Sequence, residues 1–316
     1  MSSTPTGIQH CIDRETPAGR LEATVTEVGA SLRALTIDGV DLLQPYPEEI
    51  PTPSCAGVVL VPWPNRVRDG VWRDGEEERQ LAITEPKLRN ASHGLLRYSP
   101  YSLVEPESAA DADAAAITLA ATVFPQLGYP YQLETSVRYA LVDDGVVVTH
   151  AIENVGEGDA PFAVGAHPYP TIGGVDAFEL TVRVDAATHV DVDEQRIPVG
   201  SSPVEGTPFD LRAGVRAGDV SLDDAYLDVS PDANGEHVHS LTAPDGRSVE
   251  VWGDESFGVV QVFTTSVFKG VGGLVNAVAV EPMTAPADAF NSGTGLRRLA
   301  PGETWTGSWG IRFRGF

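Results

Sequence analysis

The 316-residue chain carries 45 acidic and 21 basic residues, which give it a formal net charge of −24. A surface of this sign repels nucleic-acid phosphates and anionic membranes. The chain contains no run of about 18 apolar residues that could span a membrane, and residues 1–20 lack the basic and apolar regions of a signal peptide. We therefore expect a soluble, cytoplasmic protein with no nucleic-acid or membrane partner.

The composition favours one large domain built from strands. The hydrophobic fraction of 42% is sufficient for a substantial core, and 32 glycines and 24 prolines are spread along the chain, as is typical of short strands joined by turns. Cys11 and Cys55 are too few for a disulfide framework. We find no linker and no repeat of fixed period. We expect a single domain over residues 1–316, with residues 1–18 as a leader segment outside the core.

The first predicted elements form a hairpin near the N-terminus. Residues 20–28 alternate apolar and polar side chains as a half-buried strand does, and Gly29 ends the pattern. A second strand is predicted over residues 31–37, followed by a turn at Asp38-Gly39.

The alternating pattern is strongest between residues 101 and 155. One face of the predicted strand there is apolar or β-branched, and it consists of Leu133, Thr135, Val137, Tyr139 and Leu141. A turn at residues 143–145 leads into a strand over 146–152, and residues 303–313 alternate again. We interpret Ala109–Ala116 as an acidic loop. With no sustained helical pattern anywhere, the prediction is an all-β fold, a large antiparallel sandwich.

Four short motifs place polar side chains at the ends of predicted strands. These side chains are Asn65 with Arg66, His93, His167 and Glu281. His167 follows the apolar strand 161–166, and Pro168 ends that strand at once, because proline cannot donate to the ladder. Histidine is the side chain best suited to exchange protons near neutral pH.

Carboxylates supply the possible partners of this histidine. Glu281 follows the apolar residues 278–280 and precedes a proline, and burial there would raise its pKa towards that of a useful base. Asp223 and Asp224, taken alone, belong to a solvated acidic patch. Trp63 and Trp72 are either core residues or aromatic surfaces for the apolar faces of sugars.

Five stretches, in this order along the chain, resemble motifs of the aldose 1-epimerase (galactose mutarotase) family. They are residues 62–70 (PWPNRVRDG), 92–94 (SHG), 165–169 (GAHPY), 222–226 (LDDAY) and 280–291 (VEPMTAPADAFN). The chain departs from the usual pattern at Ser92, where an apolar residue is common, and at Asp224, where histidine is common.

The resemblance implies a galactose mutarotase-like β-supersandwich that acts on a free aldose without a metal or other cofactor. It implies that Glu281 is the general base and His167 the general acid. Arg66, His93 and Asp223 would bind the pyranose, with Asn65 beside them. We expect the protein to be a monomer or a homodimer.

Three other interpretations stay open at this point. A relative acting on hexose 6-phosphates would need clustered basic side chains to hold a dianion. A sugar-binding or regulatory protein of the same fold would have lost the acid or the base. A metal enzyme could use His93, His167 and Glu281, or His237 and His239, which share one strand face; the latter pair is more often solvated.

Overall fold

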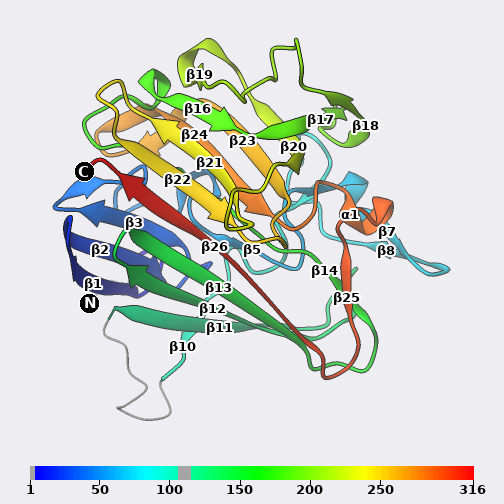
Figure 1. Cartoon of the computed structure of the whole chain (residues 1–316). Coiled ribbons are helices and arrows are strands. Elements are labelled where there is room, and N and C mark those ends of the chain that lie inside the picture. Colours follow the sequence, from blue (N-terminus) through cyan, green and yellow to red (C-terminus); the bar gives the residue numbers. More distant parts are fainter. Residues whose placement is uncertain (1–3, 106–114) are drawn as a thin grey trace.

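The computed structural model describes residues 4–105 and 115–316, and within these ranges β-strands dominate (Figure 1). The predicted acidic loop Ala109–Ala116 lies, up to residue 114, outside the described residues. All the paired strands are antiparallel, as the sequence predicts, and they form a galactose mutarotase-like supersandwich. No helix in the described part of the chain is long and apolar enough to cross a membrane.

The largest sheet has nine strands, and the C-terminal strand lies in its middle. In spatial order it comprises β10 (Ser102–Leu103), β11 (Ala116–Val123), β12 (Leu133–Val142), β13 (Gly145–Asn154), β26 (Thr304–Arg314), β22 (Ser248–Gly253), β21 (His237–Thr242), β16 (Thr181–Val184) and β19 (Val215–Arg216).

A seven-stranded sheet carries most of the motifs. In spatial order it comprises β18 (Pro198–Pro203), β17 (Ala186–Val192), β20 (Asp223–Val229), β23 (Val259–Gly270), β24 (Gly273–Met283), β15 (Gly165–Ala166) and β5 (Val59–Leu60). The strand predicted over residues 161–166 is divided in two. Its first part, β14 (Ala160–Phe162), pairs outside this sheet with β25 (Arg297–Leu299), and only β15 joins the seven strands.

The N-terminal sheet has four strands in sequence order: β1 (Gln9–Thr16), β2 (Gly19–Thr26), β3 (Leu32–Ile37) and β4 (Val40–Asp41). The predicted hairpin is present as β2 and β3. The predicted leader is wrong for residues 9–16, because β1 pairs with β2 along its whole length and Ile12 enters the core. Ile12 is the one fully buried residue of this edge strand, so the sequence shows little apolar alternation there.

The remaining elements are short. Two further pairs of strands are β6 (Arg66–Val67) with β9 (Ala91–Ser92) and β7 (Val71–Asp74) with β8 (Glu77–Gln80). The helical segments are the single α-helical turn α1 (Ala289–Ser292) and the 3-10 turns η1 (Pro53–Cys55), η2 (Arg68–Gly70), η3 (Ala177–Glu179) and η4 (Ala217–Asp219).

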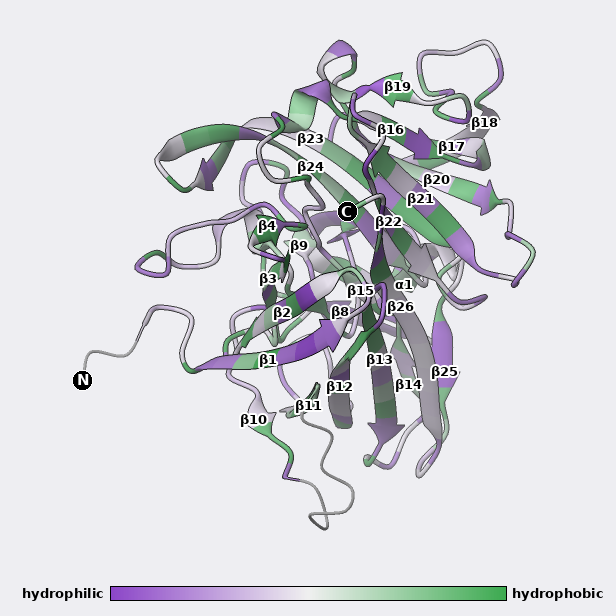
Figure 2. Cartoon of the chain, turned by 60° about the vertical axis from the view of Figure 1, so that its left-hand side comes forward, coloured by the Kyte–Doolittle hydropathy of each residue, from purple (hydrophilic) through white to green (hydrophobic). Residues whose placement is uncertain are grey.

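One continuous core joins the three larger sheets. It includes Leu21 of the four-stranded sheet, Val137 and Trp309 of the nine-stranded sheet, and Val262 and Val280 of the seven-stranded sheet. Hydrophobic and hydrophilic residues alternate along several strands, as Figure 2 shows. In β12 the five residues of the predicted apolar face are all buried, which confirms the period of two.

Candidate active site

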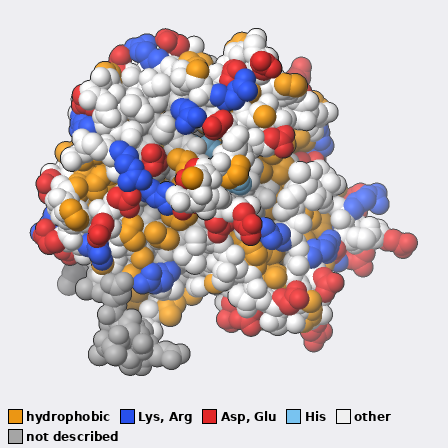
Figure 3. All heavy atoms as spheres, in the orientation of Figure 1, with side chains coloured by type: hydrophobic (Ala, Val, Ile, Leu, Met, Phe, Trp, Pro, Cys, Tyr) orange, Lys and Arg blue, Asp and Glu red, His pale blue; other side chains and the backbone are white. Residues whose placement is uncertain are grey.

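The motif residues converge on a cleft of about 320 Å³ over the seven-stranded sheet. In the space-filling view, pale blue histidine atoms are visible in a hollow among acidic and basic side chains (Figure 3). The cleft is lined by Ser54, Cys55, Asn65, Arg66, Thr84, Glu85, Ser92, His93, Arg97, Tyr98, His167, Tyr169, Asp223, Phe263 and Glu281. All six residues singled out in the sequence therefore lie around one cavity.

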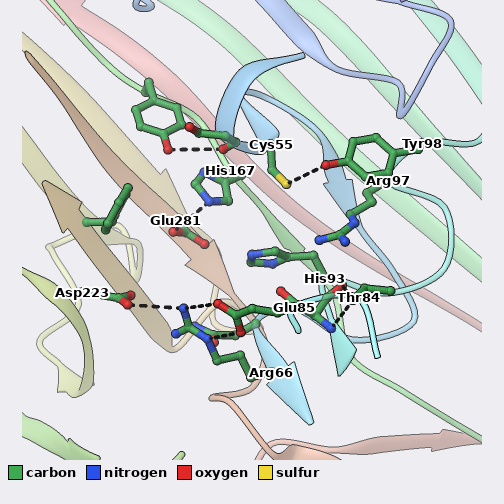
Figure 4. Close-up of a pocket in the computed structure, with 15 residues that line it drawn as sticks. Cys55, Arg66, Thr84, Glu85, His93, Arg97, Tyr98, His167, Asp223 and Glu281 are labelled. Atoms are coloured by element: carbon green, nitrogen blue, oxygen red, sulfur yellow. Dashed lines mark hydrogen bonds and ion pairs between the residues drawn. The ribbon is translucent and has the colours of Figure 1, made fainter. Parts of the chain in front are cut away.

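His167 and Glu281 are in direct contact at this cleft. Nε2 of His167 lies 3.3 Å from Oε1 of Glu281, and both side chains are buried (Figure 4). The contact follows from strand order, because β15, which ends just before His167, is the neighbour of β24, which contains Glu281. Glu281 lies within β24 rather than at its end.

A hydrogen bond and close packing fix the backbone around His167. The N–H of Gly57 donates a hydrogen bond to the carbonyl oxygen of His167 (2.8 Å). Gly165 permits the close approach of β15 to its neighbours, because a Cβ atom there would lie 2.8 Å from the Pro64 side chain and 3.1 Å from that of Met283. A rigid backbone fixes where the imidazole points.

Asn65 and His93 are brought together by hydrogen bonds between two loops. The N–H of His93 donates to the carbonyl oxygen of Asn65 (2.8 Å), and the N–H of Leu95 donates to that of Val61 (2.8 Å). Gly94, with φ of +71°, is essential to this contact, since a Cβ atom would lie 2.1 Å from the Val61 carbonyl oxygen.

Arg66 is fixed between two carboxylates. Its Nε donates to Oε2 of Glu85 (2.9 Å), and one terminal nitrogen contacts Oε1 of Glu85 (3.2 Å) and Oδ2 of Asp223 (3.3 Å). Burial alone would lower the pKa of Arg66, but the hydrogen bonds and charges of Glu85 and Asp223 outweigh it and raise that pKa. Arg66 is therefore a permanent cation with a fixed orientation.

Gln261 connects two of the predicted residues. Nδ2 of Asn65 donates to Oε1 of Gln261 (3.2 Å), and Nε2 of Gln261 donates to Oδ1 of Asp223 (2.8 Å). Gln261 is buried on β23, directly opposite Glu281 on β24. No motif marks Gln261 as a site residue, although a polar amide inside the apolar run 259–263 is a visible signal.

Burial sets the protonation of the acid–base pair. It lowers the pKa of His167 to about 4. Burial, and after it the charge of Asp223, raises the pKa of Glu281 well above its usual value, and Arg66 offsets this only in part. Between these two pKa values the pair holds a single proton, and transfer across the 3.3 Å contact interconverts the neutral pair with carboxylate and imidazolium.

His93 forms the adjoining wall. Its ring packs edge-to-face on that of His167 with centroids 5.4 Å apart, and Tyr169 stacks on the other side of His167 at 5.2 Å. Burial, and then the neighbouring His167, lowers the pKa of His93 well below its usual value. A neutral His93 can both donate and accept hydrogen bonds.

Several buried polar atoms of the cleft lack partners among residues 4–105 and 115–316. They are Oδ1 of Asn65, Nδ1 of His93, Nδ1 of His167 and Oε2 of Glu281. Buried polar groups are normally hydrogen-bonded, so this cluster indicates a polar ligand such as a polyhydroxylated molecule.

Of the two interpretations of Trp63 and Trp72, the core is correct, because both side chains are buried against Phe290. Two other expectations about individual residues are wrong. Asp224 is not a solvated residue but is 5% exposed. His239 is likewise buried on β21, away from the cleft. Among the described residues, no group of three or more His, Cys, Asp or Glu side chains is arranged to hold a metal ion.

Two charged residues of the cleft were also missed. Glu85 and Arg97 lie in the segment between residues 84 and 98 and point into the site (Figure 4). A single glutamate has no distinguishing signal in a chain with 45 acidic residues. Arg97 stands four residues after His93 in the motif region, which was a weak signal.

A larger cavity, of about 540 Å³, lies against β11 and β12. Among the described residues it is lined mainly by small and hydroxyl side chains, with Glu134 as the one charged residue and no histidine. Size alone would favour this cavity, but only the smaller cleft combines an acid–base pair with unpartnered polar atoms.

Comparisons with known proteins agree with the fold. The structure of the GalM/aldose epimerase homologue from C. elegans superimposes with a TM-score of 0.81 at 19% identity, over 97% of this chain and 99% of that one. The uncharacterized protein YihR of Escherichia coli (strain K12) is 33% identical over 90% of this chain and 88% of its own length. Human galactose mutarotase is 30% identical over 54% of this chain and 49% of its own.

The fold thus defines a galactose mutarotase-like protein. The family model for aldose 1-epimerase matches residues 15–312, nearly the whole chain. The chain belongs to the aldose 1-epimerase family.

Proposed function

We propose that this protein is an aldose 1-epimerase that interconverts the α and β anomers of a free aldohexose by general acid–base catalysis. The observation that carries the proposal is the contact of 3.3 Å between Nε2 of His167 and Oε1 of Glu281 at the cleft. Membership of the aldose 1-epimerase family supports the same reaction.

Anomer interconversion requires the sugar ring to open. The hydroxyl on C1 loses its proton while the ring oxygen O5 gains one, and the bond between C1 and O5 breaks. Since O1 and O5 are bonded to the same carbon, the base and the acid that serve them must be neighbours, as Glu281 and His167 are.

The pair keeps one proton throughout and returns to its starting state only when the ring has closed again. The Glu281 carboxylate takes the proton of O1, and the His167 imidazolium gives its proton to O5, so the pair still holds one proton. Rotation about C1–C2 then presents the other face of the aldehyde, and the ring closes with the roles reversed. Each well-placed group contributes roughly 10²–10⁴ in rate.

The other cleft residues are suited to bind hydroxyl groups. Arg66 and Asp223 offer a charged donor and a charged acceptor, and His93 and Asn65 offer neutral groups. Phe263 and Tyr169 supply the apolar surface that packs against the C–H faces of a pyranose.

The test is an anomerisation assay over a panel of aldoses. Freshly dissolved α-anomers of glucose, galactose and xylose are followed by polarimetry with and without the protein. We expect acceleration well above the buffer rate for at least one neutral aldohexose. Conversion of none of them, with tight binding of one, would identify a non-catalytic sugar-binding protein instead.

Arg97 favours a second candidate, an epimerase of hexose 6-phosphates. Its guanidinium points into the cleft and stacks on Tyr98 (4.9 Å), but it forms no ion pair with a carboxylate in the described chain (Figure 4). A guanidinium without a carboxylate partner in the described chain can bind a phosphate. Adding glucose 6-phosphate to the panel separates the candidates, and Arg97→Ala should impair only the phosphorylated substrate if this second candidate holds.

A further inference from the structure

His189 lies behind the cleft, between two carboxylates. Its Nε2 is 2.9 Å from Oδ1 of Asp224, and its Nδ1 is 3.2 Å from Oδ1 of Asp191. The ring stacks on Phe209 with centroids 3.8 Å apart, and Tyr226 packs edge-on at 5.9 Å. None of these residues lines the cleft.

The chain of contacts continues to a cleft residue. Oδ2 of Asp224 accepts a hydrogen bond from the backbone N–H of Asp223 (2.9 Å). Successive side chains of a strand point to opposite faces, so Asp223 reaches Arg66 in the cleft while Asp224 points away from it. The two aspartates thus connect the cleft with the histidine behind it.

Burying these side chains destabilises the fold unless each of their hydrogen bonds is formed. His189 is 4% exposed and Asp224 is 5% exposed. A buried carboxylate is strongly destabilising without hydrogen bonds, and Asp224 receives them from His189 and from the N–H of Asp223. Both ring nitrogens face carboxylate oxygens.

We propose that His189 and Asp224 are positioning residues that hold Asp223, and through it Arg66, in the geometry needed to bind the sugar. This inference rests on the proposed function of the cleft. The side chains themselves touch neither His167 nor Glu281, so their loss should weaken sugar binding more than it slows the chemical step.

The first test separates KM from kcat. His189→Gln and Asp224→Ala should each raise KM by about tenfold or more, as expected for loss of a charge-assisted hydrogen bond, with kcat within about threefold. Asp224→Asn keeps an acceptor for the Asp223 N–H and should recover part of the loss. His239→Gln, at another buried histidine away from the cleft, is the matched control and should leave KM unchanged.

The second test asks whether the effect passes through Asp223. In an Asp223→Ala background, His189→Gln should raise KM less than about twofold further, because the residue that it positions is gone. Independent, multiplicative effects of the two substitutions would overturn the proposal, as would a KM for His189→Gln equal to that of the wild type.

A measurement without sugar keeps this inference separate from the proposed function. If the wild-type protein converts no aldose, the proposed function fails, but the backbone N–H of Asp223 still reports on the positioning contact. His189→Gln should speed hydrogen exchange of that amide about tenfold, whereas His239→Gln should not. Equal exchange in wild type and His189→Gln would overturn the positioning role.

Discussion

Nε2 of His167 and Oε1 of Glu281 lie 3.3 Å apart, although one residue follows a strand of two residues and the other lies inside a strand of eleven. Their contact depends on β15 inserting between β5 and β24. Because both side chains are buried, the pair is most stable with one proton in total. That protonation state is the one that ring opening requires.

The pair predicts a pH profile with a broad maximum. A second proton binds only near the lowered His167 pKa of about 4, and the single proton is lost only near the raised pKa of Glu281. We expect kcat/KM to be level above about pH 5 until the raised pKa of Glu281 is reached, and to fall tenfold per pH unit below about pH 4. A rate that falls steadily below about pH 6.5 would show an unperturbed histidine instead.

Arg66→Ala should act mainly on binding. The substitution removes the cation between Glu85 and Asp223 and leaves two carboxylates that repel each other and the sugar oxygens. We expect KM to rise about 10- to 100-fold, with a smaller loss in kcat. Arg14→Ala, which removes an exposed ion pair with Asp143, is the matched control and should change neither constant.

Buried histidines predict acid sensitivity of the fold. Burial lowers the pKa values of His150 and His239 to about 3, and His150 Nε2 accepts a hydrogen bond from Trp309 Nε1 (3.0 Å), which requires that nitrogen to be unprotonated. The unfolded chain therefore binds more protons below about pH 6.5, so the free energy of unfolding falls as the pH falls.

Each such histidine contributes a slope that rises from about 0.7 kcal/mol per pH unit near pH 6.5 towards about 1.4 kcal/mol per pH unit near pH 5. Urea unfolding between about pH 6.5 and about pH 5 measures the total, and His150→Gln should reduce the slope by one histidine's share. An unchanged slope in His150→Gln would contradict the assignment of a neutral, buried His150.

Gly94→Ala tests the loop that presents His93. A Cβ atom at Gly94 would lie 2.1 Å from the Val61 carbonyl oxygen, and the φ of +71° is strained for alanine. We expect a loss of about 1–3 kcal/mol in unfolding free energy and a higher KM, because His93 moves with the loop. Gly235→Ala, at a φ of +83°, introduces the same kind of backbone strain, but its added Cβ atom would contact no neighbouring atom.

Much of the fold could be predicted from the alternation of apolar and polar residues, because a strand with one buried face has an apolar residue at every second position. The buried face of β12 and the hairpin of β2 and β3 are examples. Strand β1 shows little alternation in the sequence, because only Ile12 of this edge strand is buried, and the sequence therefore predicts a leader there. The order of strands in the sheets determines which residues lie together in the cleft. No local sequence pattern indicates that order.

Cleft residues that lie in a recognisable motif could be predicted from the sequence. Residues whose role depends on a contact with a distant strand could not. His167 and Glu281 stand in recognisable motifs. The partner of Asp224 is His189, which lies on β17, far away in the sequence. No local sequence pattern indicates that the two residues pair, so the sequence predicts a solvated Asp224. Glu85 was missed for the same reason, since its importance comes only from its contact with Arg66.

The most direct test of the account is anomerisation by Glu281→Gln and His167→Asn. Polarimetry on the aldose that the wild-type protein converts fastest measures the rate, and calorimetry measures sugar binding. Each variant should lose about 10²-fold or more in kcat while its Kd for the sugar stays within about threefold. Glu134→Gln, at an exposed position on β12, should behave like the wild type. If Glu281→Gln keeps the full rate, Glu281 is not the base and the acid–base account is wrong.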